Sequence, residues 1–231
     1  MNREHTCAQW FKSNMSAMQS GRAEAGISYG SASSLEPSLV NGLAVILGRA
    51  YREEPHVTFV IPDEQTRLRL LPSFFRVAID ASQLRGEVHV ARRANGVALW
   101  IGPGSGLTIG RTVGSGFRWI SRLLGWASLR RCIRVGLHLD KVHQRLSPGR
   151  HWYLLALGVE PSVEKERLCA TLLEPILSRA DAQGLPCYAE TFNPKDLSFY
   201  KRLGFRIAGS GKIGRSGPDF WALIIAPKPI V

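Results

Sequence analysis

An apolar run of nine residues, followed by an amphipathic helix and a second short apolar run, constrains the fold more than any other feature. The first run covers residues 151–159, and its near-absence of polar side chains is typical of a strand buried on both faces. Residues 164–182 then place leucine and isoleucine at helical spacing, and Gly184 and Pro186 end the helix. A short strand over 186–191 follows. A strand, a helix and a strand in this order predict a parallel strand pair inside a sheet.

The flanking sequence supplies further elements for the same domain. The pattern predicts an α/β fold, in which helices flank a mixed central sheet of about six to seven strands. Residues 1–35 are rich in small and polar side chains, and we expect a flexible N-terminal extension there. Residues 36–231 then form a single domain. We expect helices over 39–51, 68–77, 107–146 and 197–203, a hairpin of strands 87–91 and 96–101, and closing strands over 206–208 and 220–225.

The positive charge of the chain is concentrated in one segment. Thirty Lys and Arg face eighteen Asp and Glu, which gives a net charge of +12. Residues 105–150 hold nine of the basic residues and one acid, so they form a basic helical insert. A nucleic-acid-binding protein needs basic and aromatic side chains gathered on one face, and we do not expect nucleic acid as a partner. The insert either steers anionic partners or is a solvated amphipathic face.

Several classes of protein are excluded by what the sequence lacks. Cys7, Cys132, Cys169 and Cys187 form no CxxC pair, which argues against a disulfide scaffold and against a zinc knuckle. The six histidines show no metal-ligand spacing, so we expect no metal site. The longest uncharged stretch, 94–110, contains five glycines and a proline and does not fit a membrane span. With no secretory signal in view, we expect a cytoplasmic protein.

Two glycine-rich stretches imitate nucleotide-binding loops. The stretch 102–106 has GxGxG spacing and lacks the downstream acid of a dinucleotide site. The stretch 209–212 lacks the upstream glycine of a phosphate loop, and Ile213 stands where magnesium needs Ser or Thr. We interpret both as turns.

Three motifs in the second half of the chain resemble one known family. They are the strand that ends in Leu-Gly-Val-Glu-Pro161, the segment Glu190-Thr-Phe-Asn193, and Phe199-Tyr-Lys-Arg-Leu-Gly-Phe205. Together they resemble the GNAT family of acyl-CoA-dependent N-acetyltransferases, and within it the puromycin N-acetyltransferase type. The resemblance covers about residues 39–227. It implies the GNAT fold, acetyl-CoA as co-substrate and a small amine as acceptor.

The resemblance also implies where acetyl-CoA binds. Leu157, Gly158 and Val159 would offer backbone groups to the pantetheine arm and to the acetyl carbonyl. A helix that starts near Glu164 would present free N–H groups to the pyrophosphate. Asn193 matches an asparagine that contacts the pantetheine arm. The positions that match the phosphate loop are Glu164, Lys165, Glu166, Arg167, Leu168, Cys169 and Ala170.

The catalytic roles follow from the same resemblance. Tyr200 matches the tyrosine that serves as general acid for the leaving thiolate, and the alternative is a core tyrosine. Glu54 is our candidate for the general base, while Glu53 and His151 stay open as alternatives.

The phosphate loop departs from the family pattern. Arg167 and Cys169 replace two small residues, where glycine lets the backbone approach the pyrophosphate closely. Cys169 is either a small side chain that fills the space of the glycine or a thiol with a lowered pKa.

We therefore predict an acetyl-CoA-dependent N-acetyltransferase. The alternative is a catalytically silent GNAT-fold protein that has lost normal CoA binding and serves as a binding or regulatory module. The oligomeric state stays open, with a homodimer among the options.

Overall fold

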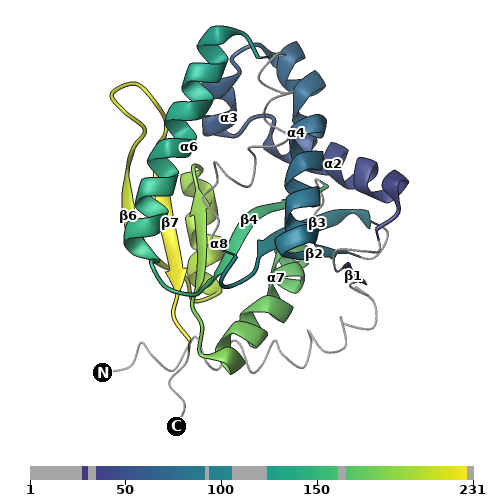
Figure 1. Ribbon diagram of the computed structural model, residues 1–231, viewed down its shortest axis with the longest axis vertical. Coiled ribbons are helices and arrows are strands. Elements are labelled where there is room, and N and C mark those ends of the chain that lie inside the picture. Colours follow the sequence, from purple (N-terminus) through teal and green to yellow (C-terminus); the bar gives the residue numbers. More distant parts are fainter. Residues whose placement is uncertain (1–27, 31–34, 92–93, 106–123, 161–164, 228–231) are drawn as a thin grey trace.

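The computed structural model describes residues 28–30, 35–91, 94–105, 124–160 and 165–227. A seven-stranded sheet in the order β1-β2-β3-β4-β5-β7-β6 forms the centre of the described structure (Figure 1). All neighbouring strands are antiparallel except β4 and β5, which are parallel. The elements are β1 (Ser28–Gly30), α2 (Pro37–Tyr51), α3 (Pro55–Val60), α4 (Glu64–Arg85), β2 (Gly86–Val90), β3 (Gly96–Ile101), α6 (Trp126–Leu146), β4 (Trp152–Val159), α7 (Lys165–Gln183), β5 (Cys187–Thr191), η2 (Pro194–Asp196), α8 (Leu197–Arg202), β6 (Arg206–Lys212) and β7 (Asp219–Ile225).

The predicted fold class is confirmed, including the parallel pair on either side of α7. Two helices near the N-terminus differ from the prediction. Helix α4 is longer than expected at both ends; at its start, the carboxylate of Asp63 accepts a hydrogen bond from Thr66 N at 2.7 Å and caps the first turn. Helix α3 was not predicted, because a proline shortly after a helical pattern is typical of a helix end. Pro55 instead begins α3, at a position where its missing N–H leaves no hydrogen bond unmade.

The structure contradicts the predicted turn at 209–212 and does not describe most of the predicted N-terminal extension and part of the basic segment. The stretch 209–212 is not a turn: it is the second half of β6, paired with β7 after a register shift between Ile207 and Gly209. A β-bulge of this kind lets a glycine-rich segment stay in the ladder. Most of residues 1–35 and residues 106–123 of the basic segment lie outside the described residues, although Ser28–Gly30 forms the edge strand β1.

Helices cover both faces of the sheet. Alternate residues of β3 point to opposite faces: Val97 and Leu99 pack with α2 and α4, whereas Trp100 packs with α7. Helix α6 lies on the same face as α2 and α4, further along the sheet, and Figure 1 shows it running beside β6 and β7. The two faces therefore have separate cores, formed by different helices.

The two parallel strands pair over only part of their length. They are in register from Trp152 opposite Cys187 to Leu154 opposite Ala189, but β4 continues to Val159. On its other side β4 has a register shift against β3 that leaves Leu155 as an extra residue. A bulge bends a strand and increases its twist. Beyond Leu154, the edge of β4 that faces β5 is thus free of strand pairing.

A glycine holds α2 close to this part of β4. A Cβ built on Gly158 would lie 2.8 Å from Leu47 Cδ2 and 3.1 Å from Ala50 Cβ. Any side chain there would push α2 away from the strand. Gly158 therefore fixes the position of the end of α2, and with it Tyr51.

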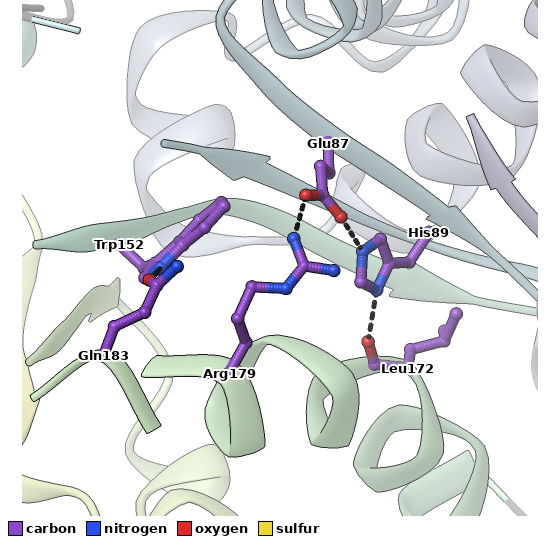
Figure 2. A network of polar contacts seen from close by, with 6 residues as sticks. All are labelled: Glu87, His89, Trp152, Leu172, Arg179 and Gln183. Atoms are coloured by element: carbon purple, nitrogen blue, oxygen red, sulfur yellow. Dashed lines mark hydrogen bonds and ion pairs between the residues drawn. The ribbon is translucent and has the colours of Figure 1, made fainter. Parts of the chain in front are cut away.

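A polar network ties α7 to the sheet on the opposite face (Figure 2). The carboxylate of Glu87 on β2 binds the guanidinium of Arg179 on α7 and lies 3.0 Å from His89 Nε2. His89 Nδ1 lies 3.3 Å from the carbonyl oxygen of Leu172 on α7. The network gives each oxygen of the Glu87 carboxylate a hydrogen-bonding partner. It therefore anchors α7 while keeping a partly buried charge compensated.

Among the helices that the structure describes, none has the length and apolar character needed to cross a membrane.

Candidate active site

A cavity of about 620 Å³ opens where β4 and β5 part. Helices α2, α3, α4 and α6 contribute to its wall on one side, and α7, η2 and α8 on the other. Most of the lining side chains are apolar, and a small number of polar groups converge among them. A concave apolar site of this kind is the usual form of a small-molecule site.

The structure brings most of the sequence-predicted site residues to this cavity. Those that line it are Glu54, Leu157, Gly158, Val159, Lys165, Glu166, Cys169 and Tyr200. Asn193 does not line the cavity but approaches it, because its Nδ2 lies 3.5 Å from Glu54 Oε1. Arg167, Leu168 and Ala170 lie on α7 away from the cavity lining, and Glu164 lies outside the described residues.

Tyr200 on α8 is buried and reaches the cavity wall. Its ring packs edge-to-face against Phe199 and Phe205, with centroid distances of 5.3 and 5.5 Å. Burial raises the pKa of Tyr200 well above its ordinary value, and the neighbouring Tyr51 raises it further. The phenol is therefore protonated at neutral pH and can donate its proton. Its packing against two aromatic rings also makes it part of the core.

Tyr51, at the end of α2, occupies the free edge of β4. Its hydroxyl accepts a hydrogen bond from the backbone N–H of Leu157, with 3.1 Å between the two heavy atoms. Burial raises the pKa of Tyr51 well above its ordinary value. A neutral oxygen thus lies where the resemblance places the acetyl carbonyl. Sequence reasoning assigned Tyr51 no role.

Glu54 is the one of the three general-base candidates that lines the cavity. Burial raises its pKa, the nearby Asp196 adds to this, and the hydrogen bond from Asn193 acts in the opposite direction. Glu53 is exposed and lies 3.7 Å from an Arg67 nitrogen. His151 lies outside the lining, with its Nε2 2.7 Å from His143 Nε2.

The first turns of α7 supply the cavity with charged side chains and one thiol. Lys165 and Glu166 line it, and Glu166 forms an ion pair with Arg202 of α8. Cys169 is buried, and burial raises the pKa of its thiol to about 12. The hypothesis of a thiol with a lowered pKa is therefore wrong, because the apolar surroundings disfavour the thiolate. Cys169 acts as a small buried side chain.

A further carboxylate lines the cavity from β5. Glu190 accepts hydrogen bonds from the Tyr188 hydroxyl at 2.8 Å and from the Tyr153 hydroxyl at 2.9 Å. Burial raises the pKa of Glu190 to about 7; the two phenols act in the opposite direction, and Asp140 on α6 raises it. Sequence reasoning quoted Glu190 in a motif but gave it no function. The available signal was a lone acid at the end of an otherwise apolar strand.

Among the described residues, no group of three or more His, Cys, Asp or Glu side chains could hold a metal ion. The polar groups at the cavity are instead donors, acceptors and proton carriers. They suit a reaction that moves a proton and polarises a carbonyl.

Comparison with known proteins points to one family. The model of the acetyltransferase (GNAT) family matches residues 112–205. A curated relative, an uncharacterised N-acetyltransferase of Schizosaccharomyces pombe, is 25% identical over 171 residues, which is 70% of this chain and 68% of the relative.

Two solved structures share the fold. One is described as histone acetyltransferase HPA2 and related acetyltransferase from Corynebacterium glutamicum. It has a TM-score of 0.59 and 21% identity, over 85% of this chain and 96% of that one. The other is arylalkylamine N-acetyltransferase 2 from Aedes aegypti, with a TM-score of 0.52 and 12% identity, over 88% of this chain and all (100%) of that one. The fold of the described residues is that of the GNAT acetyltransferases.

Proposed function

We propose that this protein is an acetyl-CoA-dependent N-acetyltransferase that acts on the amine of a small molecule. The observation that carries the proposal is the partial pairing of β4 and β5, which leaves the Leu157 N–H bonded to a phenol at a cavity wall. A backbone N–H in that position can bind a carbonyl oxygen as negative charge develops on it. The resemblance of the motifs at 151–161 and 190–205 to the puromycin N-acetyltransferase type supports a small-molecule acceptor.

The residues at the cavity fit the parts of acetyl-CoA. The free edge of β4 from Leu157 to Val159 suits main-chain pairing with the amides of the pantetheine arm. Helix α7 begins at the cavity, so its first N–H groups and the ammonium of Lys165 would bind the pyrophosphate. Glu166 adds a negative charge there, and its ion pair with Arg202 offsets it. Asn193 is placed by Glu54 near the same wall and would contact the pantetheine arm.

The proposed reaction is a direct transfer. A carbon–nitrogen bond forms between the acetyl carbon and the amine, and the carbon–sulfur bond of the thioester breaks. The Leu157 N–H stabilises the negative charge on the carbonyl oxygen once that oxygen has taken the place of the Tyr51 hydroxyl. Glu54 accepts the proton that the attacking amine loses, and Tyr200 donates a proton to the departing thiolate. The raised pKa of Glu54 suits its role, because Glu54 then binds a proton more readily, and Tyr200 is protonated at neutral pH and has a proton to donate.

The test is to incubate the purified protein with acetyl-CoA and a panel of primary amines. The free thiol of CoA is measured with Ellman's reagent, and the N-acetylated amine is measured by mass spectrometry. We expect thiol and acetylated amine to appear in equal amounts. Thiol without acetylated amine indicates hydrolysis, and no thiol with any amine contradicts the proposal.

Two observations favour a second candidate, a GNAT-fold protein that does not bind CoA. The Leu157 N–H is already satisfied by Tyr51, and Cys169 stands at a position where the family pattern has a small residue. This candidate predicts no binding of acetyl-CoA by the native chain, and binding after glycines are introduced at 167 and 169. Saturable binding by the native chain would exclude it.

A further inference from the structure

The cavity wall formed by α3, α4 and α6 is mostly apolar, with His56 of α3 and Asp140 of α6 as polar exceptions. Val60, Leu70, Phe74, Leu124, Ile133 and Leu137 line it. Ile133 and Leu137 are 45% and 58% exposed, although both are large apolar side chains. A ligand with an apolar body would remove this surface from water, and each buried Å² of apolar surface contributes about 25 cal/mol.

The charged side chains on this side of the cavity are acidic. Among the described residues, the cavity has two basic side chains in its lining, Lys165 and Lys195, and both come from α7 and η2 on the acetyl-CoA side. Asp140 of α6 and Glu190 of β5 carry the charge near the apolar wall. This negative interior contrasts with the net charge of +12 of the whole chain. This side of the cavity therefore favours a ligand with one positive group near the two acids and disfavours a ligand with a second positive group against the apolar side chains.

Glu190 has no cationic partner among the described residues. Its two hydrogen bonds come from the Tyr153 and Tyr188 hydroxyls, which are neutral because burial raises their pKa values above the ordinary range. A carboxylate offers about four lone-pair positions, so two phenols leave acceptor capacity for a ligand. A partly buried carboxylate is destabilised until a cation pairs with it.

Glu190 is also connected to the end of the cavity where acetyl transfer would occur. The Tyr153 hydroxyl donates a hydrogen bond to Glu190. Tyr153 also interacts electrostatically with Tyr51, whose hydroxyl accepts a hydrogen bond from the Leu157 N–H.

We infer that the acceptor is a monoamine with a bulky apolar body, whose nitrogen is bound by Glu190 while the body packs against α3, α4 and α6. This inference rests on the proposed function, and it assigns acceptor affinity to Glu190 and proton removal to Glu54.

The first experiment compares two acceptors of equal length, n-octylamine and 1,8-diaminooctane. The diamine differs by a second ammonium, which would have to lie against the apolar wall. The assay is run in 0.5 M NaCl to screen the exposed basic residues of α6. We expect kcat/KM for octylamine to exceed that for the diamine by about tenfold or more, because burial of an unpaired charge is strongly unfavourable. Equal or better use of the diamine would overturn the inference.

The second experiment tests Glu190 itself with the substitution Glu190→Gln, which keeps the shape but replaces one of the two acceptor oxygens by an NH2 donor, so that one phenol donates to the amide and the other accepts from it. We expect KM for octylamine to rise by about tenfold or more, since a hydrogen bond to a charged group is lost, and KM for acetyl-CoA to stay unchanged. Glu64→Gln is the matched control, because it removes the same charge from the exposed first turn of α4. An unchanged KM for octylamine would overturn the assignment of Glu190.

These outcomes separate the inference from the proposed function. If no amine is acetylated, the proposed function fails, and calorimetric titration with octylamine alone then decides the inference. Binding by the native protein that weakens in Glu190→Gln supports it, and absence of binding overturns it. If Glu190→Gln does not fold, the comparison of the two acceptors on the native protein decides.

Discussion

Glu87 and Glu190 are partly buried carboxylates on the same sheet, but their surroundings differ. Glu87 lies on β2 on the α7 face, and Arg179 and His89 bind its two oxygens (Figure 2). Burial alone would raise the pKa of Glu87, but the hydrogen bonds from His89 and Arg179 and the charge of Arg179 outweigh this and lower it. Glu190 lies on β5 at the cavity, binds two neutral phenols, and has its pKa raised to about 7.

The difference separates a structural role from a ligand-binding role. Where the fold supplies the compensating charge, as at Glu87, the carboxylate links two elements and stabilises the protein. Where it does not, as at Glu190, the fold holds a charge that a ligand can pair with. Perturbed carboxylates at a cavity are candidates for function for this reason. Tyr200 resembles Glu190 in this respect. Its hydroxyl has no hydrogen bond to any described residue, so it has a proton to offer to a ligand.

The largest expected effect is on catalysis at the cavity. Tyr200→Phe removes the hydroxyl and keeps the ring that packs against Phe199 and Phe205. We expect kcat to fall by about 100-fold or more, which is the usual contribution of a general acid, with little change in binding of acetyl-CoA. Steady-state kinetics with Ellman's reagent measures kcat, and calorimetry measures binding. A kcat within threefold of the native value would show that Tyr200 is only a core residue.

The next effect is on stability at the α7 face. Arg179→Ala removes the ion pair to Glu87 and the contact of the guanidinium with the Trp152 ring, whose centroid lies 5.7 Å away. We expect the free energy of unfolding in urea to fall by about 2 kcal/mol, because a partly buried carboxylate loses its charged partner and solvent screens only part of the loss. The turnover rate should stay within about twofold. Arg145→Ala, an exposed arginine of α6, is the control and should have little effect.

The smallest effect is a difference in pH dependence between the two glutamates. The lowered pKa of Glu87 contributes stability at neutral pH that is lost as the pH falls below about 4.5, so Glu87→Gln destabilises most near pH 7. The raised pKa of Glu190 has the opposite consequence: its contribution is present below about pH 4.5 and is lost as the pH rises through about 7.

The stability of Glu190→Gln relative to the native protein should therefore increase as the pH rises from 5 to 8. Thermal or urea unfolding of both variants between pH 5 and 8 measures the difference. If both substitutions shift stability in the same direction across this range, the distinction between the two carboxylates is wrong.

Sequence reasoning predicted the parts of the fold that depend on local pattern. The apolar run of β4, the helical spacing of α7 and the Gly-Pro stop after it were sufficient to predict the parallel pair. Local signals failed where a residue type is compatible with two structures. Pro55 both ends one helix and begins another, and the glycines of 209–212 suit a turn as well as a bulged strand.

The candidate site was predictable only in part. The backbone of β4 and the side chain of Tyr200 were named from motifs, and the structure brings them to one cavity. The hydrogen bond between Tyr153 and Glu190 and the one between Leu157 and Tyr51 were not predicted, because they join residues that are 37 and 106 positions apart. Their partners are set by which strands and helices meet in space. Burial and charge compensation, which decide the role of each acid, follow from that arrangement.

The most direct test of the central proposal is a calorimetric titration of the native protein with acetyl-CoA. If the free edge of β4 and the start of α7 form the co-substrate site, binding is saturable with one molecule per chain, and acetyl-CoA raises the melting temperature. Absence of both heat and thermal stabilisation at millimolar acetyl-CoA would contradict the assignment of this cavity to acetyl transfer.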